Sequence, residues 1–360
     1  MADLNMVQYF LGANSPSGFY SLYDQLIVPE TARAIYILKG GPGCGKSTLM
    51  RLVGAAVSAA GHQAEYILCS GDPDSLDAVV FPQLKIALVD GTAPHVVEPR
   101  YPGVVDSYVN LGDCYDKKAL GDLRQNIMGC MKGYKGCYQR AYRCLGASAE
   151  ITKDVRATLL TENLSQQLAK RAKGILSREL KMKKSGQPGA VQQRFLGAVT
   201  YKGVLCLYDT VLAQCQRVYE LVDRYGFAHE LLTHLLAGAV NGGFDVVACP
   251  DPMAPDRLAH LLIPQRSLAF VSSCADRPFP TEPYRRVRLD AMADEGILQR
   301  SRPRLRFAQK VSAALVEEAV DSLAQAKAMH DELEGLYNPH VDFERVGSIA
   351  REITREILNI

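Results

Sequence analysis

The residues with the clearest chemistry form the glycine-rich stretch GGPGCGKS, from Gly40 to Ser47. Its spacing is G-x-x-x-x-G-K-[ST], the pattern of loops that wrap backbone N–H groups around phosphate oxygens. Glycines keep Cβ atoms away from the anion, and a helix that begins at the loop adds free N–H groups. Lys46 is then expected to reach the β- and γ-phosphates, and the Ser47 hydroxyl to bind Mg²⁺. The alternative is a glycine-rich turn that binds nothing.

We assign the whole loop to nucleotide binding, with ATP and Mg²⁺ as the expected ligands. Thr48, the next residue, is expected to contact the α-phosphate. Cys44 lies inside the loop, where oxidation could block binding. The candidate nucleotide-binding residues are Gly40, Gly41, Pro42, Gly43, Cys44, Gly45, Lys46, Ser47 and Thr48.

A second chemical element is KIALVDGTAPH, in which four apolar residues end in Asp90. This pattern predicts a strand whose terminal Asp holds Mg²⁺ together with Ser47, or else an Asp that caps a turn. The next residue is Gly91, where many ATPases carry a water-activating Glu. Hydrolysis is therefore expected to be slow, or phosphate goes to an acceptor other than water. His95 is the nearest candidate base or sensor, or a structural histidine, so the candidate catalytic residues are Lys46, Asp90 and His95.

Elements predicted around these residues would bring them to one edge of a sheet. A strand over Ala34–Leu38 and a helix over Lys46–Ala60 flank the glycine-rich loop. A second strand, AEYILCS, ends just before DPDSLD, in which Asp74 or Asp77 could contact substrate or water, and Asp72 or Asp74 could cap a short helix. The third strand ends at Asp90. Strands that alternate with helices predict a parallel sheet covered on both faces.

The chain repeats this organisation. YFLGANSPSGFYSLYDQ, from Tyr9, returns as RFLGAVTYKGVLCLYDT, from Arg194, and DPDSLDAVVFPQ returns as APDRLAHLLIPQ. We therefore predict an α/β protein of two tandem P-loop NTPase-like parallel-sheet units. Residues 1–187 form the active unit and residues 188–360 a degenerate unit, joined by a linker over Lys183–Ala190. Because both copies keep the opening motif, we expect it to serve folding or unit–unit packing.

Each unit is predicted to end in a helical hairpin. Residues 120–144 show the 3,4 spacing of a coiled-coil seam, and a second helix carries apolar residues from Ile151 to Leu168. In the second unit, helices over Arg306–Tyr337 and Asp342–Ile357 are separated by NPH.

The second unit has lost the glycine-rich loop. VDRYGFAHELL stands opposite KGGPGCGKSTL, with His229 in place of Lys46 and Glu230 in place of Ser47. Added Cβ atoms and carboxylates both oppose a triphosphate. This copy is expected to serve as a pseudo-dimer partner or as a scaffold. As a partner it could supply an arginine to the active unit, with Arg224, Arg277 and the YRR stretch from Tyr284 to Arg286 as candidates.

Composition excludes several classes of protein. The net charge is +2, and no apolar run approaches the roughly 18–20 residues of a membrane span. Ten cysteines without a CxxC pair indicate reduced thiols and a cytoplasmic location. Basic stretches at Lys170–Lys184 and Arg300–Arg306 could meet nucleic acid or another anionic partner, but few aromatic residues accompany them, which argues against single-strand recognition. HELLTH, from His229, lacks the spacing of a zinc-protease box.

Together, the opening repeat, IYILKGGPGCGKSTLM, KIALVDGTAPHVVEPRYPG and HDELEGLYNPHVDFERV resemble a bacterial family of tandem P-loop ATPases, also described as nucleotide-kinase-like. The resemblance spans almost the whole chain and implies ATP binding and a cytoplasmic location. Family members often carry a P-loop in both halves, and this chain departs from that pattern at Val222–Leu232.

Three functions are consistent with these features. The first is a Mg·ATP-dependent ATPase, used as a switch or remodeller, whose second half is inactive. The second is a small-molecule or nucleotide kinase, since an acceptor other than water would explain Gly91. The third is a nucleotide-binding adaptor that presents its helical hairpins to a protein partner. A homo-oligomer is compatible with each of them.

Overall fold

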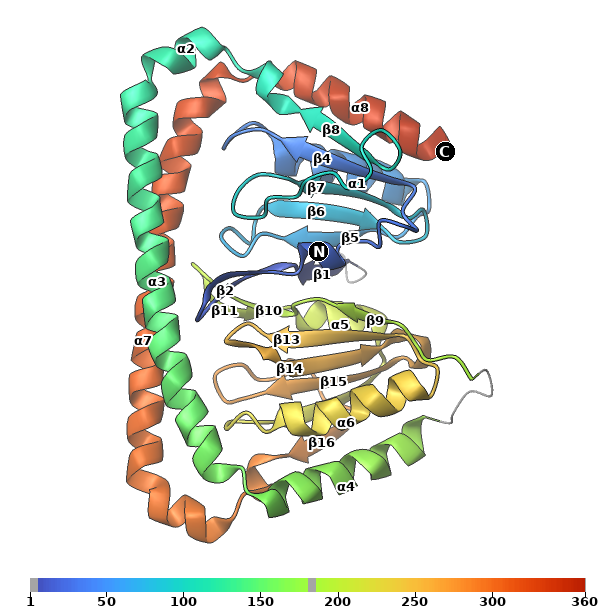
Figure 1. Ribbon diagram of the computed structural model, residues 1–360, viewed down its shortest axis with the longest axis vertical. Coiled ribbons are helices and arrows are strands. Elements are labelled where there is room, and N and C mark those ends of the chain that lie inside the picture. Colours follow the sequence, from blue (N-terminus) through green and yellow to red (C-terminus); the bar gives the residue numbers. More distant parts are fainter. Residues whose placement is uncertain (1–5, 181–185, 360) are drawn as a thin grey trace.

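The computed structural model describes residues 6–180 and 186–359. They form two similar α/β units whose six-stranded sheets lie one above the other, and two long helices run along one side of both units (Figure 1). The predicted α/β class and the internal repeat are confirmed. The expected linker lies partly outside the described residues, and its remainder, 186–190, forms no helix or strand.

Both sheets have the same topology. The first follows the order β1 (Val7–Phe10), β5 (Glu65–Leu68), β6 (Leu76–Phe81), β7 (Ile86–Asp90), β4 (Ala34–Lys39), β8 (Asp106–Asn110). The second follows the order β16 (Arg285–Arg288), β12 (Arg217–Val222), β15 (Leu268–Ser273), β14 (Ala254–Ile263), β13 (Val246–Asp251), β9 (Val191–Gln193).

The sheets are mixed, which corrects the prediction of purely parallel sheets. β6 is antiparallel to both β5 and β7, and β14 is antiparallel to both β13 and β15. The short helix expected in this region is absent, because Leu76–Phe81 is a run of six buried residues in a strand. The connection Cys69–Ser75 is also too short for a parallel crossover, which takes a dozen or more residues.

The repeated opening motif forms a small hairpin in each unit, β2 (Gly12–Ser15) with β3 (Gly18–Ser21) and β10 (Gly197–Thr200) with β11 (Gly203–Cys206). The two copies meet where the units touch. Phe10 and Phe195 exchange backbone hydrogen bonds of 2.9 Å each, and the Asn14 side chain donates to the Val199 carbonyl at 2.9 Å. The motif therefore joins the units, as we expected from its retention in both copies.

The helices are α1 (Lys46–Ala59), α2 (Lys117–Asp122), α3 (Arg124–Leu159), α4 (Glu162–Glu179), α5 (Tyr208–Gln214), α6 (Ala228–Asn241), α7 (Glu295–Tyr337) and α8 (Phe343–Asn359). The break at NPH between α7 and α8 agrees with the prediction. The break predicted between residues 144 and 151 is wrong, because α3 continues to Leu159 and the chain turns only at Thr161. The Thr161 hydroxyl caps α4 by accepting a hydrogen bond from the Leu164 N–H.

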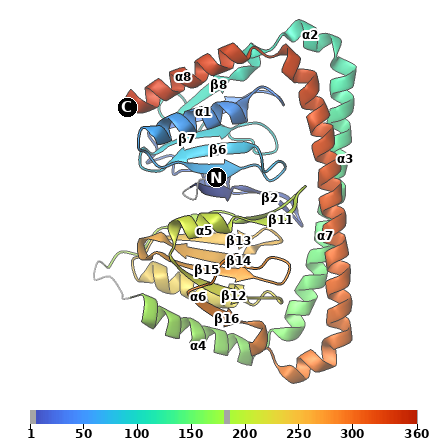
Figure 2. The same ribbon diagram turned by 180° about the vertical axis from the view of Figure 1, so that it is seen from behind.

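The long helices exchange partners between the units. α3 and α7 pack antiparallel, with Arg140 on Ser322 and Ser148 on Ser312 (Figures 1 and 2). α3 carries the chain to the second unit, where α4 packs beside α6, and α7 carries it back to the first unit, where α8 packs beside α1. Each unit therefore completes its hydrophobic core with a helix from the other half of the chain.

Candidate functional site

The glycine-rich loop connects β4 to α1 at the carboxyl edge of the first sheet. Gly43 and Gly45 have φ angles of +68° and +84°, a region that residues with a Cβ seldom adopt. At Gly40, a Cβ would meet the buried Cys44 sulfur at 2.6 Å. Because glycine has no side chain to cap α1, the loop leaves the first N–H groups of the helix without a side-chain acceptor.

Lys46 and Asp90 face each other beside this loop. The Lys46 ammonium donates to the carbonyls of Gly40 and Gly41, at 2.8 and 2.9 Å, and lies 3.6 Å from Asp90 Oδ2. Both side chains are close to nine-tenths buried. The lysine is thus held across the loop by weak neutral acceptors, which an anion of higher charge density can replace.

Among the described residues, the hydrogen bonds to Ser47 and Asp90 leave one lone pair of the Ser47 hydroxyl unused and leave Asp90 Oδ2 facing only Lys46. The Ser47 hydroxyl accepts from the Leu76 N–H at 2.9 Å. One Asp90 oxygen, Oδ1, accepts from the Thr92 N–H and hydroxyl, at 2.8 and 2.6 Å, so Asp90 does cap a turn. Its other oxygen, Oδ2, faces Lys46. The turn-capping role of Asp90 is therefore compatible with the predicted Mg²⁺-binding role. Thr48 lies exposed at the start of α1.

His95 is buried and ion-paired. Its Nε2 lies 3.3 Å from Asp77 Oδ1, and the Tyr23 hydroxyl donates to Asp77 Oδ2 at 2.7 Å. Burial by itself lowers the pKa of His95, but the Asp77 carboxylate outweighs it and the pKa is raised. Likewise, burial raises the pKa of Asp77, but the charge of His95 and the hydrogen bonds from His95, Tyr23 and Cys69 together outweigh it and the pKa is lowered. The two side chains therefore form a charged pair.

Tyr23 is a site residue that the sequence did not reveal. It belongs to the opening repeat, and its counterpart Tyr208 instead donates to the Ser272 carbonyl at 2.9 Å. A comparison of the two copies could have indicated this role. The strand position that holds Asp77, the partner of Tyr23, in the first unit holds Ala259 in the second.

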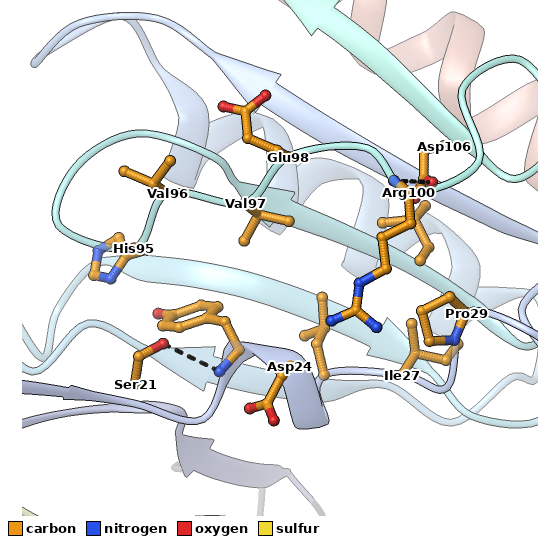
Figure 3. Close-up of a pocket in the computed structure, with 13 residues that line it drawn as sticks. Ser21, Asp24, Ile27, Pro29, His95, Val96, Val97, Glu98, Arg100 and Asp106 are labelled. Carbon is orange, nitrogen blue, oxygen red and sulfur yellow. Dashed lines mark hydrogen bonds between the residues drawn. The ribbon is translucent and has the colours of Figure 1, made fainter.

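A cavity of about 330 Å³ lies beside His95, under the loop that follows β7 (Figure 3). Asp24 and Ile27 line one side, and the Arg100 guanidinium points into it from the opposite side; Tyr23 also lines it. The cavity does not include the glycine-rich loop, so it is a separate space that shares His95 with the candidate site.

In the second unit a carboxylate occupies the start of the corresponding helix. Asp223 accepts hydrogen bonds from the N–H groups of Phe227 and Ala228, at 2.8 and 2.7 Å, where α6 begins. Burial raises the pKa of Asp223 to about 6. His229, in the place of Lys46, accepts from the Leu258 N–H at 3.0 Å. This loop thus carries its own anion, which adds a physical reason for the predicted loss of nucleotide binding.

The second half of the chain does reach the glycine-rich loop, but through the corner between α7 and α8. A Cβ at Gly43 would meet Asn338 Oδ1 at 2.6 Å, and one at Gly45 would meet Phe343 and Val346 at 3.4 Å. The arginines that were candidates for reaching the active unit contact residues of the second half of the chain instead. Arg224 hydrogen-bonds Gln309, Arg277 interacts with Asp251, and Arg286 pairs with Glu220 at 2.5 Å.

The HELLTH motif lies at the start of α6, and the described basic residues of each basic stretch lie on α4 or α7. His229 and His234 join no group of metal-ligating side chains among the described residues. In Arg300–Arg306, Arg304 pairs with Asp154 on α3 at 2.6 Å. The basic stretch Lys170–Lys184 runs along α4, but its residues from 181 onward lie outside the described part. All ten cysteines are described, and none forms a disulfide.

Comparison of the chain with protein-family models, with curated proteins and with solved structures finds no match. Among the described residues, no helix combines the length and the apolar character that crossing a membrane requires.

Proposed function

We propose that the protein is a P-loop ATPase that binds Mg·ATP at Gly40–Thr48 and hydrolyses it slowly, as a switch. The observation that carries this proposal is the Lys46 ammonium, held across a loop with two left-handed glycines and 3.6 Å from Asp90. The order β4, loop, α1 with β7 beside β4 also supports a P-loop NTPase-like unit.

The free oxygen capacity of the site fits Mg²⁺. Ser47 and Asp90 are the side chains that would hold the ion, since the Ser47 hydroxyl retains a lone pair and Asp90 Oδ2 meets no N–H donor other than Lys46 among the described residues. The ion would neutralise charge on the phosphate oxygens. The loop N–H groups and Lys46 would bind the phosphates, and Thr48 would contact the α-phosphate from the first turn of α1.

Slow hydrolysis follows from the surroundings of Gly91. A Cβ at this position would meet Ile37 Cγ2 at 2.5 Å, so the Ile37 side chain leaves no room for a glutamate there. His95 is the nearest candidate for orienting water, and its charge is coupled to those of Asp90 and Lys46. The Asp77 carboxylate raises the pKa of His95, which disfavours the neutral imidazole that would accept a proton from water.

The second unit is proposed as an inactive partner that supports the active one. Its Asp223 carboxylate accepts a hydrogen bond from the N–H group at the start of α6 that a phosphate would otherwise use. Its helix pair α7–α8 packs on the glycine-rich loop. A change in the loop on nucleotide binding would therefore press on the α7–α8 corner. The long α3–α7 pair connects that corner to the second unit and offers a surface to a protein partner, as an adaptor would.

One observation favours a kinase as the second candidate. The cavity beside His95 has room for a small acceptor, and Arg100 could pair with an anionic group on it. A screen of metabolites with ATP would decide this: a phosphorylated product formed together with ADP would replace the ATPase proposal by the kinase.

The decisive test is isothermal calorimetry of Mg·ATP binding to the full chain. Wild type and His229→Ala are expected to bind alike, whereas Lys46→Ala loses binding, because only Lys46 lies in a loop without an internal carboxylate. His229 is the matched control, since it occupies the equivalent position in the second unit. Equal affinity of wild type and Lys46→Ala would refute the site assignment, and rapid hydrolysis without a partner would refute the switch.

A further inference from the structure

Three side chains of different chemistry converge beside the glycine-rich loop. Cys69 follows β5, Asp77 lies at the start of β6, and His95 lies in the loop after β7. One potential ligand atom from each lies within 4.8 Å of the others. The antiparallel β6 makes this possible, because it brings its first residues to the edge where β5 and β7 end.

The spacing of the nitrogen and oxygen atoms fits a shared ion. His95 Nε2 and Asp77 Oδ1 are 3.3 Å apart, longer than the roughly 2.7–2.9 Å of a charge-assisted hydrogen bond. Nitrogen and oxygen ligands about 2.0–2.2 Å from a tetrahedral zinc ion lie about 3.4 Å from each other. The pair is therefore spaced as two ligands of one metal would be.

The surrounding groups hold these side chains as the neighbours of a metal centre hold its ligands. The Tyr23 hydroxyl donates to Asp77 Oδ2 at 2.7 Å, which leaves Oδ1 for an ion. The rings of Phe19 and Tyr23 lie against the His95 ring, with centroids 5.1 and 4.9 Å away. These contacts restrict the rotation of both ligands.

The histidine also has hydrogen-bonding capacity that no protein group uses. His95 is only 7% exposed, and its Nδ1 is buried with no hydrogen-bond partner among the described residues. At Cys69, burial raises the pKa of the thiol well above its ordinary value, and hydrogen bonds from the backbone N–H groups of Asp72 and Gly71 oppose this only in part. Such N–H donors also stabilise a metal-bound thiolate.

The second unit provides an internal comparison. The strand register places Asp251 and Ala259 where the first unit has Cys69 and Asp77, and Arg277 stands in the place of His95. Asp251 and Arg277 attract each other there. Among the described residues, the second unit thus has an aspartate and an arginine that attract each other where the first unit has the cluster, so the cluster is not a feature of the repeated fold.

We propose that Cys69, Asp77 and His95 form a binding site for a divalent transition metal, with zinc the best match. Zinc accepts thiolate, imidazole and carboxylate ligands together, and the thiolate and carboxylate neutralise its two charges. Three protein ligands leave a fourth position for water. The ion would tie the ends of β5 and β6 to the loop after β7, beside the proposed nucleotide site, and would make His95 a ligand rather than a base.

The test measures zinc and cobalt on the purified full chain. The protein is stripped with a chelator, incubated with Zn²⁺ in excess Mg²⁺, dialysed, and analysed by elemental mass spectrometry. Wild type and the control Cys274→Ser, which alters a strand-end cysteine of the second unit, are expected to retain about one zinc ion. Cys69→Ser and Asp77→Asn are expected to retain less than a tenth as much.

Cobalt and stability measurements make the outcome unambiguous. Co²⁺ is expected to give a thiolate-to-metal charge-transfer band in wild type and none in Cys69→Ser. Zn²⁺ is expected to raise the melting temperature of wild type but not of the Cys69→Ser and Asp77→Asn variants, while the stripped proteins melt alike, which separates loss of the site from misfolding.

Lys46→Ala is expected to keep the metal, so the nucleotide proposal can fail independently. Wild type without zinc, cobalt without the band, or Cys69→Ser with full zinc would overturn the site.

Discussion

The exchange of helices between the units can be tested with two isoleucines in equivalent roles. Ile353 on α8 is 4% exposed and belongs to the hydrophobic cluster that contains the core of the first unit, where α8 packs on α1. Ile175 on α4 is 3% exposed and belongs to the core of the second. If each helix stabilises the sheet on which it packs, Ile353→Ala must weaken the first unit, although Ile353 lies at the far end of the chain.

The magnitude follows from burial. Changing a buried isoleucine to alanine costs about 2–5 kcal/mol, as the sum of lost transfer free energy and the cavity left behind. Both side chains are almost fully enclosed, so the two variants are expected to lie in the same part of that range. A loss of this size is a large fraction of the free energy of unfolding of a typical domain, and it accelerates amide exchange in the affected unit by at least about 30-fold.

Hydrogen exchange followed by mass spectrometry locates the effect. Ile353→Ala is expected to lower protection in peptides that cover β4, β7 and α1, and Ile175→Ala in peptides that cover β12, β15 and α6. Each variant serves as the control for the other. Loss of protection mainly in the second unit of Ile353→Ala, or unchanged protection in the first unit, would refute the assignment of α8 to the first core.

Three further predictions concern single residues. Gly43→Ala should lower the free energy of unfolding by about 1–2 kcal/mol in denaturant titrations, because φ is +68° there, whereas Gly129→Ala, in an open position on α3, should not lower it. Arg194→Ala should cost about 3–5 kcal/mol in the same assay, because it leaves the Glu65 carboxylate, 2.5 Å from Arg194, unpaired between the units; a loss below 1 kcal/mol would contradict this. The folded pKa of Asp223, about 6, exceeds the unfolded value of 3.8, so this group stabilises the fold below pH 4 and loses up to about 3 kcal/mol as the pH rises through 6. Stability measured against pH should lack this loss in Asp223→Asn.

Local sequence was enough to predict the elements around the glycine-rich loop. Ala34–Leu38 was expected as a strand and Lys46–Ala60 as a helix, and the structure differs by one residue at one end of each. The sequence NPH also predicts the break between α7 and α8, which the structure confirms. The direction of β6 was not, because an apolar run such as LDAVVF is compatible with several elements, and only the short connection before it excludes a crossover.

The sequence by itself determined that Gly40–Ser47 forms a glycine-rich loop with a lysine at the start of a helix, and that the second copy lacks both. These features depend on residues that are adjacent in the chain, so backbone sterics and charge decide them locally. Only the tertiary structure decided that α4 and α8 change units, that Asp223 takes the place of an anion, and that Cys69, Asp77 and His95 meet. Those contacts join residues far apart in the chain, and they form because each sheet must cover its apolar face with whichever helix the fold delivers to it.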